Sequence, residues 1–361
     1  MSDRDAAPAL VSDLLGSCPL PFTGYDRVLL GHGSGGRLSG ELISRLFLPA
    51  LGNHVLNRLE DQGTCQLPGL SGARIAMTTD SFVVRPIFFP GGDIGKLAVH
   101  GTINDLAVGG ATPLFLTAAF ILEEGLALED LRRIAMSMRA AADDAGVTLI
   151  AADTKVVDRG KGDQVFITTT GLGIVSEDRV LSIAAARPGD KVIVSGTIGD
   201  HGIAIMSVRE GLEFETALES DTAALHGLSE TMLAACDGIR LMRDPTRGGV
   251  SSALNETATG SRVGVSLVES ALPLRPSVRA ACEILGLDPL YVANEGKLIA
   301  VVAADDADHL LEVMKSHPLG RDAAIIGEVT GDHRGSVVMR SLAGGTRVVP
   351  LLAGEQLPRI C

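Results

Sequence analysis

The chain has 361 residues, more than one hydrophobic core usually holds, so two domains are expected. Hydrophobic residues make up 46% and charged residues 21% of it, which is typical of a soluble globular protein. The net charge of −13 argues against binding to nucleic acid or to an anionic membrane, because both need clustered cations. A phosphate ligand remains compatible with this charge, since a bound metal ion can neutralise acids locally.

The N-terminus lacks the cationic and then apolar pattern of a signal peptide. The longest apolar stretches, such as residues 113–122, are too short to span a membrane. The five cysteines form no CxxC pair, and their odd number favours reduced thiols over a disulfide framework. We therefore expect a cytoplasmic protein.

The first predicted element is a glycine-rich loop. Residues 1–27 are rich in Ala, Ser, Pro and short acids, and indicate a flexible lead-in. A strand-like run, Arg27–Leu30, precedes the sequence GHGSGGR, and a helix with apolar residues on one face follows from Leu38 to Phe47.

Alternating strand and helix patterns follow. Strands are predicted over 74–79, 114–122, 147–152 and 165–175, with the first and third ending at Asp80 and Asp153. Helices are predicted over 94–108, closed by Gly109 and Gly110, and around 131–142, with Gly146 as C-cap.

A turn at residues 187–190 precedes a new strand at 191–195, so we place the domain boundary near 180–188. The second half again alternates helices and strands up to residue 349, which predicts two α/β or α+β domains. The predicted units are 28–183, 184–350 and a mobile tail over 351–361 that carries Cys361.

The glycine-rich loop allows three interpretations. It matches G-x-G-x-x-G between a strand-like run and a helix, the setting of a dinucleotide site. However, no second strand ending in an acid follows about 20 residues later, which disfavours that interpretation. A glycine hinge and a mobile lid over phosphates are the alternatives, and a P-loop enzyme is excluded because no Walker A sequence is present.

Four aspartates are the main candidates for a metal–phosphate site. Asp80 and Asp153 each end a predicted strand, and Asp105 lies on the apolar stripe of its helix, where an unpaired acid is costly. Asp244 can also be explained as the N-cap of the next helix, with Pro245 at the first helical position. Each acid alone suits a structural role, whereas together they supply hard oxygens for Mg²⁺ against phosphates.

The other polar candidates carry weaker signals. Lys155 and Glu295 lie in predicted loops beside strands, where a salt-bridged surface role is the default. His32 and His201 have no assigned role, and zinc is not expected without an HExxH motif or a Cys/His cluster. The terminal Cys361 has no expected packing purpose and does not fit prenylation, so a carrier thiol and an incidental residue both remain open.

The motifs in order resemble those of HypE, the carbamoyl dehydratase family of nickel–iron hydrogenase maturation. They are Gly33-Ser34-Gly35-Gly36, Thr78-Thr79-Asp80-Ser81, Asn104-Asp105-Leu106-Ala107, Asp153-Thr154-Lys155, Asp244-Pro245-Thr246-Arg247-Gly248-Gly249, Asn294-Glu295-Gly296 and Pro358-Arg359-Ile360-Cys361. The acidic motifs alone would indicate only the wider aminoimidazole ribonucleotide synthetase and selenophosphate synthetase superfamily. The terminal PRIC is specific to HypE and favours Cys361 as a carrier.

The resemblance implies a PurM-like fold with an ATP-binding N-terminal domain and a second α/β domain. It implies a homodimer, HypF as carbamoyl donor and the HypC–HypD complex as cyanide acceptor. It also implies that Cys361 is carbamoylated and then dehydrated to a thiocyanate with ATP and Mg²⁺. The site residues implied in this way are Asp80, Asp105 and Asp244 for Mg²⁺–ATP, Gly35, Gly36, Asn104, Asp153, Thr154 and Thr246 near the nucleotide, and Lys155 and Glu295 for dehydration.

Two other functions remain open on the sequence. One is a different phosphotransfer enzyme of the superfamily, of the selenophosphate synthetase kind, which would act on a free small substrate. The other is a nucleotide-binding scaffold for a maturation complex.

Overall fold

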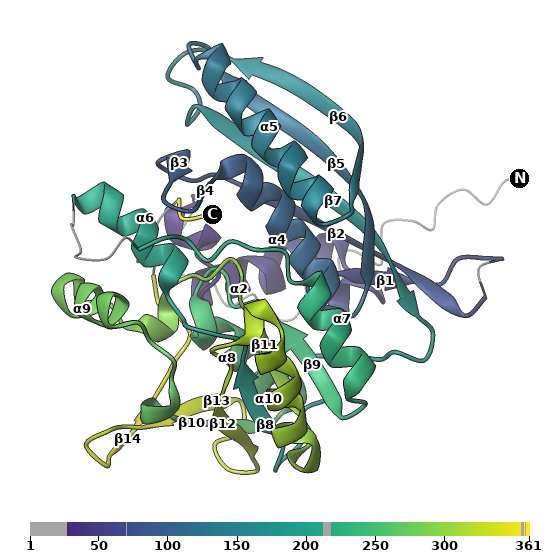
Figure 1. Cartoon of the computed structure of the whole chain (residues 1–361), viewed down its shortest axis with the longest axis vertical. Coiled ribbons are helices and arrows are strands. Elements are labelled where there is room, and N and C mark those ends of the chain that lie inside the picture. Colours follow the sequence, from purple (N-terminus) through teal and green to yellow (C-terminus); the bar gives the residue numbers. More distant parts are fainter. Residues whose placement is uncertain (1–26, 70, 212–217, 355–356, 358) are drawn as a thin grey trace, which may run out of the picture.

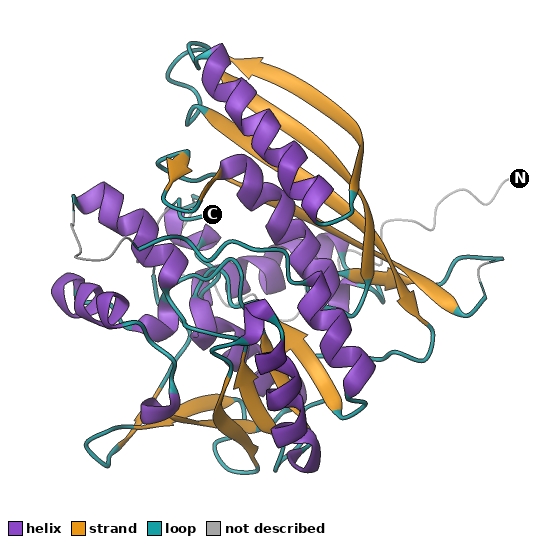
Figure 2. Ribbon diagram, viewed as in Figure 1, coloured by secondary structure: helices purple, strands orange, loops and turns teal. Residues whose placement is uncertain are grey.

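The computed structural model describes residues 27–69, 71–211, 218–354, 357 and 359–361. It contains two large β-sheets in two halves of the molecule, each with helices packed against it (Figures 1 and 2). The C-terminal end lies between the two halves, beside β4 and α6 (Figure 1).

The first sheet has the strand order β1-β2-β7-β5-β6. Only β5 and β6 run parallel, and the other neighbours are antiparallel. Its strands are β1 (Gly63–Cys65), β2 (Ala73–Phe82), β5 (Thr112–Glu123), β6 (Thr148–Val157) and β7 (Val165–Ser176). Buried and half-buried residues alternate along β7, because one face of the sheet is covered by helices and the other is not.

Helices α4 (Ile94–Val108) and α5 (Leu128–Asp144) cover one face of this sheet (Figure 1). The carboxylate of Asp93 caps α4 by accepting from the backbone N–H groups of Gly95 at 2.7 Å and Lys96 at 3.2 Å. Nearly every side chain of α4 is buried, because the helix contacts the first sheet, α5 and also α7 (His226–Ala235) of the second half. A helix buried on all sides is thus the central element of the fold.

The second sheet has the order β14-β13-β10-β12-β8-β11-β9. Its strands are β8 (Lys191–Val194), β9 (Ile239–Arg243), β10 (Gly264–Val268), β11 (Ile299–Val302), β12 (Ala324–Thr330), β13 (Ser336–Arg340) and β14 (Thr346–Val348). Helix α8 (Gly249–Ser261) packs against one face, and α7 and α10 (Ala307–Ser316) pack against the other. The inner strands β8 and β11 are apolar nearly throughout, since both of their faces are covered.

Shorter elements surround these two layers. A helical segment follows the glycine-rich loop. It consists of α2 (Arg37–Leu42), a π-helical turn (Ile43–Phe47) and α3 (Leu48–Leu51). Helices α6 (Asp200–Glu210) and α9 (Pro276–Leu285) pack against each other, and strands β3 (Phe88–Phe89) and β4 (Gly92–Asp93) form a small hairpin. Within the described ranges, no helix is both long and apolar enough to cross a membrane.

The structure confirms the predicted helices over 94–108 and 131–142, with Gly146 in a left-handed conformation directly after the C-cap of α5. Two predicted strand ends are wrong. β2 continues past Asp80 to Phe82, and β6 continues past Asp153 to Val157, because both strands stay paired with their neighbours beyond the acids. Asp80 and Asp153 therefore project from strand interiors.

Two expectations near the glycine motifs are also wrong. Arg27–Leu30 contains no strand, because it has no strand partner among the described residues and leads into a 3₁₀ turn at Leu30–Gly33. Asp244 is not a helix cap, since α8 begins only at Gly249, after Gly248 at φ +78°. The carboxylate of Asp244 is thus not used by a helix end.

Asn104 on α4 joins the two halves of the molecule. Its Nδ2 group donates to the carbonyls of Ala223 at 3.0 Å and Glu295 at 3.2 Å, and its Oδ1 accepts from the N–H of Leu225 at 2.8 Å. The side chain is buried, and the bonds to Glu295 and Leu225 are buried with it, so losing them is costly.

We expect Asn104→Ala to destabilise the protein by about 3 kcal/mol, because it removes three hydrogen bonds, two of them buried and one half-buried, that join the two halves. The midpoint of urea unfolding measures this loss. Asn53→Ala is the matched control, since Asn53 also accepts two backbone N–H groups but is exposed, and it should cost about 1 kcal/mol. Equal midpoints for the two variants would contradict the joining role of Asn104.

Candidate active site

Three of the predicted aspartates meet between the two halves of the molecule. Asp80 comes from β2, Asp105 from α4, and Asp244 from the segment directly after β9. Together with Thr246, Glu295 and Cys361 they line a small cavity of about 40 Å³. The Oγ1 of Thr78 donates to Oδ2 of Asp105 at 2.6 Å, and Asp105 also bonds to Asp80. The three aspartates thus come from separate elements of the fold and converge on one cavity.

The carboxylates of this cluster repel one another. Burial, followed by the charges of Asp80 and Asp244, raises the pKa of Asp105 well above its usual value. Burial and then Asp80 raise the pKa of Asp244 to about 6, and burial raises the pKa of Asp80. Without a cation, the cluster therefore holds protons at a pH where exposed aspartates are ionised.

Glu295 lies at the same cavity and is 2% exposed. Its backbone N–H donates to Oδ1 of Asp221 at 3.0 Å, and Asp221 is paired with Lys297 at 3.1 Å. Burial, followed by the charges of Asp244 and Asp221, raises the pKa of Glu295 well above its usual range. Its Oε1 atom is buried and has no hydrogen-bond partner among the described residues, so it can accept a proton or a ligand group.

The end of the chain reaches into this cluster. Ile360 is 4% exposed and belongs to the apolar core of the first half, with Cys361 packed against it. The expectation that a terminal cysteine has no packing purpose is therefore wrong, because the last two residues extend the core. The thiol of Cys361 hydrogen-bonds to Glu295, and burial and then Glu295 raise its pKa far above that of a free cysteine.

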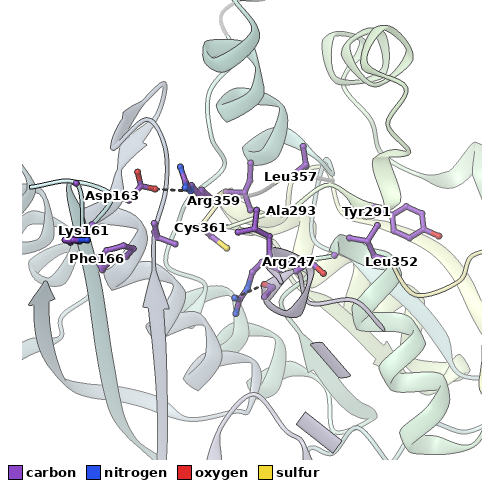
Figure 3. A pocket seen from close by; sticks show the side chains of 18 residues that line it. Lys161, Asp163, Phe166, Arg247, Tyr291, Ala293, Leu352, Leu357, Arg359 and Cys361 are labelled. Atoms are coloured by element: carbon purple, nitrogen blue, oxygen red, sulfur yellow. Dashed lines mark hydrogen bonds and ion pairs between the residues drawn. The ribbon is translucent and has the colours of Figure 1, made fainter. Parts of the chain in front are cut away.

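A larger cavity of about 510 Å³ lies on the outer side of Cys361. Figure 3 shows the residues around it, with the sulfur of Cys361 close to Arg247 and with Arg359 directed toward Asp163. Its walls come from the glycine-rich loop, from residues 160–163 and from the tail. The thiol thus lies between an inner acidic cavity and an outer, wider one.

The glycine-rich loop packs tightly against two other segments. A Cβ atom on Gly35, whose φ is +71°, would lie 2.6 Å from the carbonyl oxygen of Arg247. A Cβ atom on Gly36 would lie 2.3 Å from the carbonyl oxygen of Leu352, which accepts from the N–H of Arg37. These glycines allow close backbone approach, and residues 27–30 do not form the strand that a dinucleotide site has before its glycine-rich loop.

The structure does not bring Asp153, Thr154 and Lys155 to the cluster within one chain. They lie on the exposed edge strand β6, where Asp153 is aligned with Ala119 of β5, Thr168 of β7 and Ser81 of β2. Asp153 is thus three strand spacings from β2, roughly 14 Å.

Two charged residues beside the cluster, Arg247 and Asp61, were not predicted as site residues from the sequence. Arg247, within the DPTRGG motif, donates to the carbonyl of Gly33 at 3.2 Å, and the charges of Cys361 and Asp80 raise its pKa. Asp61 is paired with Arg243 at 3.1 Å, and its negative charge helps to raise the pKa of Asp105. Asp61 has no sequence signal of its own, because only the fold places it near the cluster.

We expect Asp105→Asn to stabilise the metal-free protein, since it removes one of the repelling carboxylates while keeping an oxygen for Thr78. A rise in melting temperature on the order of 3 °C is expected at neutral pH. Asp143→Asn, on the exposed surface of α5, is the control and should not change the melting temperature. A lower melting temperature for Asp105→Asn would contradict the repulsion.

The same repulsion determines whether the stability of the metal-free protein rises or falls with pH. Because the pKa values of the cluster are raised in the folded state, the folded chain binds more protons than the unfolded chain between about pH 4 and pH 6 or above. The metal-free protein should therefore become less stable as the pH rises through this window, and Asp105→Asn should weaken the trend. Thermal unfolding at a series of pH values measures it.

Comparison with known proteins identifies the family. The AIR synthase related protein N-terminal domain matches residues 60–175, and the AIR synthase related protein C-terminal domain matches residues 187–340. The chain is 58% identical over 335 residues to the carbamoyl dehydratase HypE of Cupriavidus necator, covering 93% of this chain and 95% of that protein.

Solved structures agree with this relationship. A crystal structure of a HypE–HypF complex superposes with a TM-score of 0.81 at 50% identity, covering 86% of this chain and 99% of that chain. HypE in complex with ATP superposes with a TM-score of 0.78 at 48% identity, covering 93% and 100%. The expected pair of PurM-like α/β domains is thus confirmed, and the chain belongs to the HypE family of AIR synthase related proteins.

Proposed function

We propose that this chain is an ATP-dependent carbamoyl dehydratase that converts S-carbamoyl-Cys361 to S-cyano-Cys361 for the iron of nickel–iron hydrogenase. The observation that carries the proposal is the position of the Cys361 thiol at the same small cavity as Glu295 and the three aspartates. Its relative from Cupriavidus necator is a carbamoyl dehydratase. A free-substrate phosphotransfer enzyme would have no use for its own chain end at this point.

The second substrate is ATP, as in the ATP complex of a HypE structure. Asp80, Asp105 and Asp244 suit Mg²⁺, because their oxygens are hard ligands and their mutual repulsion is relieved by a cation. Among the described residues, no three His, Cys, Asp or Glu side chains are close enough to hold an ion by themselves. Mg²⁺ commonly takes one or two carboxylates together with substrate phosphates, so the aspartates would hold it together with ATP, and it would neutralise phosphate charge there.

The first chemical step activates the carbamoyl oxygen. In S–C(=O)NH₂ this oxygen is a poor leaving group, so it attacks the γ-phosphorus of ATP, ADP leaves, and one N–H proton is lost. The product is an O-phosphorylated imidate. Orientation of the two substrates is the main requirement of this step, and the docked tail supplies it. Arg247 lies close to Cys361 and offers a cation for the charge that develops there.

The second step removes phosphate and the remaining N–H proton, which leaves S–C≡N. Glu295 is our candidate base, because a buried carboxylate with a raised pKa is more basic than an exposed one. Its unpartnered Oε1 atom and its hydrogen bond to the Cys361 thiol place it next to the group that reacts. Docking also limits access of water, which would hydrolyse the intermediate.

The docked thiol is half-buried, so loading and delivery require the tail to leave the cavity. We propose HypF as the carbamoyl donor, in line with the HypE–HypF complex, and the HypC–HypD complex as the cyanide acceptor. We propose that the reaction takes place in the cytoplasm, where thiols stay reduced; among the described residues Cys65, Cys236, Cys282 and Cys361 are free, which is compatible with that location.

We further propose a homodimer that brings β6 of one copy to the acidic cluster of the other. Asp153, Thr154 and Lys155 lie on the exposed strand β6, away from the cluster of their own chain. The strand also exposes Leu149, Ile150 and Val156, and Phe115 and Ile121 of β5 are exposed beside it. In this dimer Lys155 steadies the charge of the phosphorylated group, and Asp153, Thr154, Gly35 and Gly36 lie near the nucleotide.

Glu295→Gln should leave carbamoylation of Cys361 intact and slow dehydration by roughly 10²- to 10⁴-fold, because the base is lost while the shape is kept. Mass spectrometry of the C-terminal peptide, after incubation with the carbamoylating partner and ATP, measures both steps. Cys361→Ala should carry neither modification. Dehydration at the normal rate in Glu295→Gln would remove Glu295 from the role of base.

Mixing two inactive variants tests the dimer. If Lys155 acts on the neighbouring subunit, a mixed dimer of Lys155→Ala and Glu295→Gln chains contains one complete site. Exchanged mixtures should then regain part of the dehydration rate, whereas each variant alone should not. Mixtures that stay as inactive as the separate variants, although exchange is shown by native mass spectrometry, would place Lys155 outside the site or within its own subunit.

A further inference from the structure

The last three residues pair with the backbone that follows β2. The N–H of Val83 donates to the carbonyl of Cys361, and the N–H of Arg85 donates to the carbonyl of Arg359, both at 3.2 Å. These two hydrogen bonds come from alternate residues, as when a peptide adds to a strand edge, but neither segment forms a regular strand and Arg359 has φ +55°. Main-chain contacts of this kind hold a peptide but do not select its sequence.

The intervening residue, Ile360, is held from the opposite side. Its carbonyl receives a hydrogen bond from Nε2 of His201 at 2.7 Å, and Nδ1 of His201 lies 2.7 Å from Oγ of Ser220. The side chain of Ile360 is buried in the apolar core of the first half. His201 therefore contacts the tail directly, and no motif in the sequence predicted this contact.

Arg359 is recognised through both its side chain and its carbonyl. Its Nε lies 3.0 Å from Oδ2 of Asp163, and its carbonyl accepts from Nη2 of Arg209. Arg209 also donates through Nε to the carbonyl of Arg85 at 2.5 Å, so it bridges the tail and the segment after β2 with which the tail pairs. Figure 3 shows the Arg359 side chain extended toward Asp163.

Asp163 supplies the negative charge that balances the cations around Arg359. The guanidinium groups of Arg85, Arg209 and Arg359 lie near one another, and burial followed by the charges of Arg359 and Arg85 lowers the pKa of Arg209. Asp163 is the carboxylate in ion-pair contact with Arg359. Removing its charge would leave the tail's cation facing two others.

We propose that Val83–Arg85, Asp163, His201 and Arg209 form a peptide-binding site that selects the chain's own Arg-Ile-Cys end. In this site Asp163 determines specificity by reading Arg359. The ligand class is a peptide with a basic residue two positions before a C-terminal cysteine, bent at that basic residue, where Arg359 has φ +55°. The inference deepens the proposed function, because it names what holds the carrier substrate, yet docking itself occurs without turnover.

Reading Arg359 sets the register of the thiol. The tail bends at Arg359, where φ is +55°, so a slip of one residue along Val83–Arg85 would carry the thiol away from Glu295. The Arg359–Asp163 pair and the burial of Ile360 both oppose such a slip. Asp163, His201 and Arg209 are thus positioning residues, since they touch the tail but not the reacting atoms.

Alkylation of Cys361 by a maleimide, followed by mass spectrometry of the C-terminal peptide, measures docking without ATP. In the native chain alkylation should be slow, because the docked thiol is half-buried and neutral. Asp163→Arg should speed it on the order of tenfold, since the new cation repels Arg359. Adding Arg359→Asp to the same chain should restore slow alkylation by re-forming the pair in reverse.

Asp143→Arg is the matched control, because it makes the same charge change in the exposed pair of Asp143 with Arg139 on α5. It should not alter alkylation of Cys361. Asp163→Asn, which keeps the side-chain shape, is the second variant if Asp163→Arg does not fold, and it should speed alkylation in the same direction. Native-like slow alkylation in folded Asp163 variants, or failure of the reversed pair to restore it, would overturn the proposal.

Single-turnover dehydration of carbamoylated protein separates this inference from the proposed function. If both hold, dehydration should slow in Asp163→Arg and recover in the reversed pair. If the alkylation pattern appears but native protein shows no dehydration, the peptide site stands and the proposed function fails. If native protein dehydrates normally and Asp163→Arg neither exposes the thiol nor slows the reaction, the peptide site fails alone.

Discussion

Repulsion among half-buried carboxylates is the constraint on which the rest of the site depends. Asp80, Asp105 and Asp244 come from a strand, a helix and a loop; the charges of Asp80 and Asp244 raise the pKa of Asp105, and that of Asp80 raises the pKa of Asp244. Such an arrangement costs stability in the free protein and is relieved by a bound cation or by protons. The buried helix α4 keeps Asp105 in place against this repulsion, because its ends are capped and its faces are packed on both halves of the molecule.

The tail turns this charged cluster into a site with a defined substrate. The acids alone could serve any phosphotransfer enzyme of the superfamily, whereas the docked Cys361 places one specific atom beside Glu295. Docking relies on backbone pairing, on a buried Ile360 and on one ion pair at the surface, rather than on a large apolar interface. Contacts of this limited kind suit a tail that must also leave to meet other proteins.

Much of this could be predicted from the sequence, and the failures have physical causes. The period of apolar residues predicted α4, and the burial of its stripe singled out Asp105. The capping pattern wrongly predicted Asp244 as a helix cap, because Gly248, at φ +78°, is the N-cap and α8 begins only at Gly249. Lys155 and Glu295 could not be placed, since strand order is not encoded locally and puts Lys155 on a distant edge. The contacts of His201 and Asp163 with the tail depend on residues far apart in sequence and had no local signal.

The central claim is that ATP activates the oxygen of the carbamoyl group carried by Cys361. The most direct test labels that oxygen with a heavy isotope, supplies unlabelled ATP in ordinary water, and measures the mass of the released phosphate. Attack of the carbamoyl oxygen on the γ-phosphate predicts that the heavy oxygen appears in the phosphate as the thiocyanate forms. Unlabelled phosphate, released at the rate of dehydration, would contradict the account.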